Sequence, residues 1–289
     1  MDLATTLTDP ELQSSLIPLL LSIFLTGVLR VLGGQKMGGF LACAAVGVGF
    51  VLIAILVNGI PAFPPRSSGQ KIVFLVGALT AAGVVIDLLN LSKLKRYLIS
   101  ALLLAAAVTW IALPLLKGFT SAATLSWAVV VILSSVALFR LMQTSPSTLN
   151  APTMVLCSAL AVGAVAMIGA TATITQYSFA LAALIGGFLL WNWPKFRFPF
   201  GTAAILGGGG ALALLVTQQT LFTRGSSMPL LALVLVFFCD RALAKIKDFK
   251  RNPGPVFAPI ILGAICMIPV ALVVGTVFFL SADTDPYLG

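Results

Sequence analysis

The chain alternates between long apolar stretches and short polar connections along its whole length. Each apolar stretch runs for about 20 residues, the length that an α-helix needs to cross the hydrocarbon core of a bilayer. The bilayer offers no water to satisfy the backbone, so helices are the expected spanning element. The pattern predicts an all-α polytopic membrane protein with ten transmembrane helices, at about residues 14–33, 38–59, 71–90, 97–116, 123–142, 151–171, 176–193, 201–222, 228–244 and 257–281.

Composition supports this fold class, because 60% of the residues are hydrophobic and only 9% are charged. A typical soluble domain carries about 25% charged residues. The connections leave no room for a soluble domain, so we expect a single transmembrane domain over residues 1–289, with polar outer tails at 1–13 and 282–289. The first tail is polar and acidic, so we predict no cleaved signal peptide.

The basic residues predict the orientation, because cytoplasmic loops of membrane proteins are rich in Lys and Arg. If the N-terminus lies outside, the outer connections hold only Arg66, Lys71, Lys117 and Arg224, and the other 13 of the 17 basic residues fall on the inner side. We therefore expect both termini outside and the functional loops in the cytoplasm. We then attribute the net charge of +9 to contacts of these basic residues with anionic lipid head groups, and we expect no nucleic-acid partner.

Few residues are available for catalysis. The chain has no histidine, and its four cysteines lie inside apolar stretches without CxxC spacing, so we interpret them as small apolar fillers. Five of the eight acidic residues lie in the expected outer tails. On the inner side only Asp87, Asp240 and Asp248 remain, and Asp240 lies beside Arg241 and near Lys245.

Several inner connections carry short motifs in a common order. The segment "GVVIDLLNLSKLKRYLISALLLA" (residues 83–105) is similar to the one after the third helix of the polyprenyl-phosphate N-acetylhexosamine-1-phosphate transferases, the glycosyl transferase family 4. The segment "NWPKFRFPFGTAAILGGGG" (192–210) resembles the loop that leads into that family's eighth helix. Weaker similarities are found in "KRNPGPVFAPI" (250–260), "GGQKMGGFLACA" (33–44) and "STLNAPT" (147–153).

The resemblance implies ten helices with both termini outside. It also implies a reaction in which a polyprenyl phosphate attacks a UDP-sugar, with Mg²⁺ neutralising the phosphates. Where the family has paired aspartates this chain has Ile86 and Asp87, and where it has Gly-Asp this chain has Gly201 and Thr202. The family's histidines fall on the apolar run 261–267. The resemblance therefore implies a divergent member that lacks most catalytic residues, with no metal site and no cofactor; Mg²⁺ is expected only if activity survives.

The candidate site residues follow from the same alignment. Asp87 is the remnant catalytic candidate. It is either a former metal ligand or a residue at the end of a span, and in the second case it is paired with Lys93 or Arg96 or simply hydrated at the interface. The candidates for binding a lipid or a phosphate are Asn90, Lys93, Asn150, Asn192, Lys195, Arg197 and Gly201.

Two of these assignments have plainer alternatives. For Asn192, Lys195 and Arg197 the pattern favours a polar cap on a span whose tryptophans lie in the interfacial belt. The glycine run 207–210 is compatible with a ligand that approaches the backbone or with close packing of helices.

Three functions are compatible with these observations. The first is a catalytically degenerate relative of the transferases in the bacterial cytoplasmic (inner) membrane. It would bind a membrane lipid such as undecaprenyl phosphate, or a protein partner in the membrane, during cell-envelope glycan biosynthesis. The second is an active but divergent UDP-sugar:polyprenyl-phosphate sugar-1-phosphate transferase. The third is a small-molecule transporter, which the lack of a charge at mid-span disfavours.

Overall fold

The computed structural model describes residues 10–65, 67–118, 120–144, 148–223, 228–249 and 254–282. Within these ranges every regular element is helical and there is no β-strand. Most of both predicted outer tails lies outside the described residues, as do Ser147, Arg251 and the side chain of Asp248.

The helices follow the predicted apolar stretches closely. In chain order they are α2 (Pro10–Ser14), α3 (Leu16–Leu32), α4 (Gly34–Ala42), α5 (Ala45–Asn58), α6 (Ser68–Leu88), α7 (Lys93–Leu116), α8 (Ser121–Gln143), α9 (Asn150–Ile168), α10 (Ala172–Asn192), α11 (Thr202–Ala204), the π-helix η1 (Ile205–Gly209), α12 (Gly210–Phe222), the 3₁₀-helix η2 (Met228–Phe238), α13 (Cys239–Phe249) and α14 (Gly254–Ala282). Elements α11, η1 and α12 form one continuous helix over residues 202–222.

Eight helical segments among the described residues are long and apolar enough to cross a membrane, so this is a multi-pass membrane protein. The two remaining predicted spans correspond to α3, which has 17 residues, and to the η2–α13 segment, which changes from 3₁₀ to α geometry. The count of ten spans and the outward direction of the termini stay predictions.

The chain turns sharply between α3 and α4, where the apolar pattern predicts the first connection. Gly34 has φ +59°, a left-handed conformation that glycine adopts without steric cost. Arg30 closes the turn by donating from Nη1 to the carbonyl of Gly34, at 2.5 Å. The predicted second span is divided into the short helix α4 and the longer helix α5, with Cys43 and Ala44 between them.

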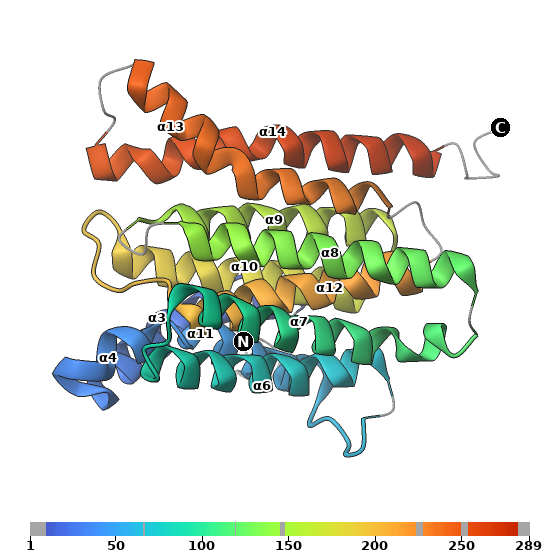
Figure 1. The fold of residues 1–289 in the computed structure, drawn as a ribbon, viewed down its shortest axis with the longest axis horizontal. Helices are drawn as coiled ribbons and strands as arrows, with labels where there is room; N and C mark the ends of the chain where they lie inside the picture. The colour runs from blue at the N-terminus through green and yellow to red at the C-terminus, as the bar shows by residue number, and fades with distance from the viewer. Residues whose placement is uncertain are drawn as a thin grey trace, which may run out of the picture.

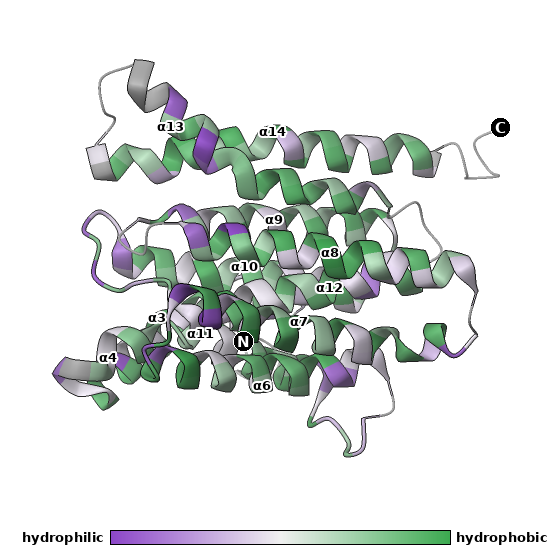
Figure 2. Cartoon of the chain, viewed as in Figure 1, coloured by the Kyte–Doolittle hydropathy of each residue, from purple (hydrophilic) through white to green (hydrophobic). Residues whose placement is uncertain are grey.

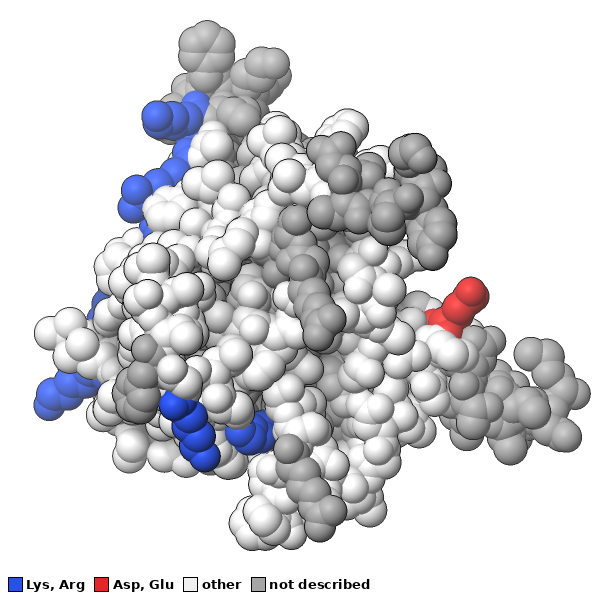
Figure 3. Space-filling view, turned by 90° about the vertical axis from the view of Figure 1, so that its right-hand side faces the viewer, with Lys and Arg blue, Asp and Glu red and all other residues white. Residues whose placement is uncertain are grey.

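The helices lie side by side in one bundle, and α4, α11 and α13 lie at the same end (Figure 1). The connections α6–α7 and α10–α11 also lie at this end, which we call the basic end. Hydrophilic residues gather near the ends of the helices, whereas their sides are mostly hydrophobic (Figure 2). Seen from the opposite end, most of the described surface carries no charged residue (Figure 3).

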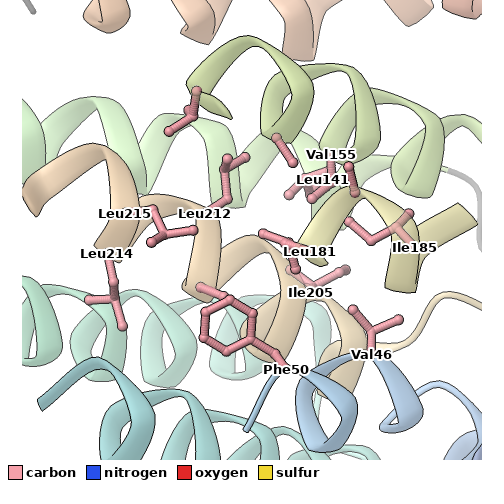
Figure 4. Close-up of a cluster of buried hydrophobic side chains, with 14 of the residues drawn as sticks. Val46, Phe50, Leu141, Val155, Leu181, Ile185, Ile205, Leu212, Leu214 and Leu215 are labelled. Atoms are coloured by element: carbon pink, nitrogen blue, oxygen red, sulfur yellow. The ribbon is translucent and has the colours of Figure 1, made fainter. Parts of the chain in front are cut away.

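The core lies where α9 and α10 pack against each other and against α5 and α12. Phe50, Leu181, Ile185 and Leu214 are fully buried here and come from three different helices (Figure 4). Apolar side chains therefore fill the centre of the bundle, and the polar groups considered below lie at the basic end.

Glycines allow α6 to approach the helix over residues 202–222 very closely. A Cβ added to Gly83 would lie 2.5 Å from the Cα of Ala203, and one added to Gly207 would lie 2.7 Å from the Oγ1 of Thr80 in α6. Small residues at such positions are typical of helix packing in membranes. Of the two roles considered for the glycine run 207–210, these contacts favour close packing of helices.

We predict that Gly83→Ala destabilises the protein, because the added methyl group meets the backbone of α11 and cannot be accommodated by a side-chain movement. Overpacking of this kind costs about 1–3 kcal/mol. Thermal unfolding of the purified protein in detergent measures the effect. Gly77→Ala, on the same helix, is the matched control, since its Cβ would lie no closer than 3.7 Å to another group. Equal unfolding temperatures for the two variants would contradict the prediction.

Candidate functional site

Asp87 caps the beginning of a different helix. It is the penultimate residue of α6, it is 6% exposed, and its Oδ2 accepts a hydrogen bond from the backbone N–H of Ala203 at 3.1 Å. Ala203 lies in the first turn of the helix over residues 202–222, where backbone N–H groups lack partners within the helix. The carboxylate also lies at the positive end of that helix dipole.

The expected pairing of Asp87 with Lys93 or Arg96 is not formed. Among the described residues Asp87 makes no ion pair, and the backbone of α11 takes that place. The close approach of the two backbones at Gly83 brings the start of α11 onto the end of α6, where the N–H of Ala203 reaches the carboxylate.

Gly201 lies directly against this carboxylate. A Cβ added to Gly201 would lie 2.8 Å from the Oδ2 of Asp87 and 3.3 Å from the Sγ of Cys43. Thr202, at the position where the resembled family has a carboxylate, is 2% exposed. The structure thus brings together Asp87 and Gly201, two of the predicted site residues.

Asn192 organises the connection between α10 and α11. Its Oδ1 accepts hydrogen bonds from the N–H groups of Arg197 and Phe198, at 3.0 and 2.7 Å, and its Nδ2 donates to the carbonyl of Phe188 at 3.1 Å. The side chain is 1% exposed. All these bonds are made to the backbone, which matches the interpretation of a polar cap.

The other candidates in these connections lie at the surface. Lys195, Arg197 and Asn90 are exposed, and the Arg197 guanidinium lies 5.8 Å from the centre of the Trp191 ring. Asn150 is half-buried as the first residue of α9. None of these four residues lines the cavity described next.

A cavity of about 700 Å³ opens at the basic end between the first turn of α7, the last turns of α8 and the start of the helix over residues 202–222. Its polar lining includes two predicted residues, Lys93 and Gly201. Sequence reasoning assigned no role in ligand binding to the remaining polar lining residues, which are Arg96, Tyr97, Gln143, Thr144 and Thr202. The sequence could have indicated Arg96 as a lining residue, because residues three apart on a helix share a face and Lys93 was already a candidate.

The cavity is electropositive. Lys93 and Arg96 line it, whereas no Asp or Glu does, and neither cation forms an ion pair with a described residue. Arg96 Nε is buried without a hydrogen-bond partner. Lys93 and Arg96 also lie in the first turn of α7, where the helix dipole is positive and no acidic residue compensates it. This arrangement favours an anion.

An apolar pocket of about 60 Å³ lies deeper in the bundle, between α8, α12 and η2. It shares two lining residues, Leu141 and Ile205, with the electropositive cavity. The rest of its lining consists of leucine, valine, alanine and phenylalanine side chains and Gly209, with Ser134 and Ser158 as the hydroxyl groups. The two spaces therefore adjoin each other, one cationic and one apolar.

A buried ion pair lies beside both the electropositive cavity and the apolar pocket. Arg140, near the end of α8, contacts Asp240 at 2.7 Å and donates to the carbonyl of Phe237 at 3.2 Å and to the Oε1 of Gln143 at 2.7 Å. Arg241 and Lys245, its neighbours along the chain, are both exposed, and Arg140 from another helix is the ion-pair partner of Asp240. The contact ties the η2–α13 junction to α8.

The described residues do not fit a Mg²⁺ ion. They contain no group of three or more His, Cys, Asp or Glu side chains that could hold a metal. Asp87 is bonded to the backbone of Ala203 and Asp240 to Arg140, so the two carboxylates are used at separate places. Mg²⁺ takes oxygen ligands in near-ideal octahedral geometry, which these residues do not provide together.

We predict that Asp87→Leu destabilises the protein, because it leaves the N–H of Ala203 buried without an acceptor, at a cost of about 1–3 kcal/mol. Asp87→Asn keeps an oxygen acceptor and should lose less. Thermal unfolding in detergent measures both, with exposed Lys95→Gln as the control that should change little. An Asp87→Leu variant as stable as the wild type would show that the contact contributes nothing.

Comparison with known proteins leaves the family open. No model of a protein family matches the sequence, and no curated protein is significantly similar to it. The resemblance to the transferases therefore depends on the motifs of the inner connections alone.

Proposed function

We propose that this protein binds a phosphate-bearing lipid of the polyprenyl phosphate class without catalysing sugar-phosphate transfer. In this proposal it is a divergent relative of the polyprenyl-phosphate sugar-1-phosphate transferases in the bacterial cytoplasmic membrane. There it acts as a lipid-binding component in cell-envelope glycan biosynthesis. The observation that carries the proposal is the electropositive cavity that adjoins an apolar pocket.

The cavity supports an anionic head group. Lys93 and Arg96 bring two positive charges, and the first turn of α7 adds backbone N–H groups that Ser92 does not cap. A helix N-terminus with nearby cations is a favourable site for phosphate. Tyr97, Gln143 and Thr144 offer further hydrogen-bonding groups around the same space.

The apolar pocket supports a hydrocarbon tail. A tail that leaves the cavity past Leu141 and Ile205 would reach the pocket between α8, α12 and η2. Transfer of apolar surface into such a lining is favourable by roughly 25 cal/mol per Å². A free nucleotide or inorganic phosphate would make no use of this pocket, which is why a lipid is favoured.

The carboxylates support the non-catalytic part of the proposal. Asp87 is the only described acid in the segments that carry the resemblance, and its hydrogen bond to Ala203 gives it a structural role. Asp240 is paired with Arg140. Phosphoryl transfer depends on metal ions that neutralise the phosphates, and these two side chains hold no such ion together.

We predict that Lys93→Gln combined with Arg96→Gln weakens the binding of undecaprenyl phosphate by about tenfold or more, because charged hydrogen bonds contribute about 1.5–3 kcal/mol each. Native mass spectrometry of the full chain in detergent measures the affinity. The matched control is Lys195→Gln combined with Arg197→Gln, which removes the same two charges at the basic end but outside the cavity.

Two outcomes would overturn the binding site. Equal losses in both double variants would mean that binding follows the net charge of the basic end. Equal affinity for undecaprenyl phosphate and for inorganic phosphate would mean that the apolar pocket holds no tail.

We also predict that the purified protein forms no lipid-linked sugar from undecaprenyl phosphate and UDP-N-acetylglucosamine in the presence of Mg²⁺, because the described carboxylates provide no metal site. Thin-layer chromatography of the radiolabelled sugar measures the product. Turnover that disappears in Asp87→Asn would favour the active transferase instead.

A further inference from the structure

The electropositive cavity has two sides of different chemistry. On the α7 side, Lys93 and Arg96 come from the first turn of that helix. On the α8 side, Gln143 is the last residue of the helix and Thr144 follows it. Lys and Arg side chains only donate hydrogen bonds, so the α7 side suits a group that only accepts them, such as a phosphate. The α8 side carries neutral groups of both kinds.

Gln143 offers a donor to the cavity. Its Oε1 accepts a hydrogen bond from Arg140 Nη1 at 2.7 Å, and Nη2 of the same guanidinium is held by Asp240 at 2.7 Å. A carboxamide consists of one oxygen acceptor and one NH2 group with two donors. Because the ion pair holds the oxygen, the NH2 group of Gln143 is the part that remains to bind a ligand.

Thr144 offers an acceptor. Its Oγ1 donates a hydrogen bond to the carbonyl of Leu141 at 2.6 Å. A hydroxyl has a single proton, so the oxygen of Thr144 can only accept a further hydrogen bond. A phosphate monoester is mostly dianionic at neutral pH and has no proton to give. A ligand that bonds to this oxygen therefore carries an O–H or N–H group besides its phosphate.

The cavity is also larger than a phosphate requires. Its volume is about 700 Å³, and clefts that hold whole drug-sized ligands measure about 300–1,000 Å³. A phosphate group is a single phosphorus with its oxygens, and it fills a small part of such a space. Tyr97 and Thr202 bring two further hydroxyl groups to the lining. The cavity thus has both the volume and the hydrogen-bonding groups for a second, neutral part of the head group.

We propose that the head group bound here is a sugar joined to the lipid through its phosphate, with the phosphate on the α7 side and the sugar hydroxyls on the α8 side. A sugar hydroxyl accepts a hydrogen bond through its oxygen and donates one through its proton, so it matches both Gln143 and Thr144. The ligand is then a glycolipid that a separate glycosyl or sugar-phosphate transfer supplies. This inference rests on the proposed function, because it names the lipid that occupies the same cavity.

The affinities of the purified full-length protein for two phosphodiesters of undecaprenol test the inference. One lipid carries glucose on its phosphate and the other carries a methyl group, so their charges and tails are equal and only the first has sugar hydroxyls. We expect the wild type to bind the glucose lipid about tenfold more tightly, because two neutral hydrogen bonds contribute about threefold each. Native mass spectrometry in detergent measures both dissociation constants.

Two variants examine the α8 side. Gln143→Met and Thr144→Val each remove one hydrogen-bonding group and should lower the preference for the glucose lipid to about threefold. The matched control is Thr153→Val, which should keep the wild-type preference. Thr153 Oγ1 donates to the carbonyl of Leu149 at 2.7 Å, the same kind of bond that Thr144 makes, but Thr153 does not line the cavity. Both lipids are measured on the same variant, so a general loss of stability leaves their ratio unchanged.

Equal wild-type affinity for the glucose and methyl lipids overturns the inference, and this comparison decides it even if a variant fails to fold. Phosphatidylglycerol bound as tightly as the glucose lipid also overturns it, because the ligand is then an abundant membrane lipid. So does a preference that is unchanged in both Gln143→Met and Thr144→Val.

The inference and the proposed function fail in different ways. If the wild type does not distinguish the two phosphodiesters but Lys93→Gln combined with Arg96→Gln weakens the binding of both, the cavity binds a lipid phosphate without a sugar. If this double variant binds both phosphodiesters as tightly as the wild type does, the proposed function itself fails.

Discussion

The contact between α6 and α11 is the interaction on which the basic end depends. A helix that begins inside a membrane protein leaves backbone N–H groups that no water satisfies, and each costs several kcal/mol in hydrocarbon. Asp87 provides an acceptor for one of these groups, and Gly83 lets the two backbones meet so that the carboxylate can reach it. This contact fixes Gly201 and Thr202 as part of the cavity wall.

The polar residues of the basic end then divide into two groups. Asp87 and Asn192 use their oxygens on the backbone, so they position α11 and the connection before it. Lys93 and Arg96 form no ion pair with a described residue and line an open space. The first group holds the backbone in place, and the second is the group that we propose for a ligand. The residues that look most like remnants of catalysis therefore make structural contacts.

The helices were predictable from the sequence, because the length of an apolar stretch is set by the thickness of the bilayer and needs no knowledge of neighbouring helices. The division of the second predicted span into α4 and α5 was not, since an interruption of the helix at Cys43 and Ala44 leaves the hydropathy pattern unchanged. For the candidate site the sequence named Asp87 and Gly201 among the candidates, but it did not predict which groups they contact. The pairing of Arg140 with Asp240 depends on how helices dock, and docking is decided by small residues spread along several helices.

A comparison of Arg140, which is buried, with Arg96, which is half-buried, supports an anion as the ligand of the cavity. Arg140 lies in the last turn of α8, where the helix dipole favours a cation, and it also has a carboxylate, a carbonyl and an amide as partners. Arg96 lies in the first turn of α7, where the dipole disfavours a cation, and its buried Nε has no partner. A cation at the unfavourable end of a helix, with Lys93 one turn away, raises the free energy of the unliganded protein. An anion that binds beside both cations removes this cost, and a phosphate with a tail in the adjoining pocket does so while remaining in the membrane.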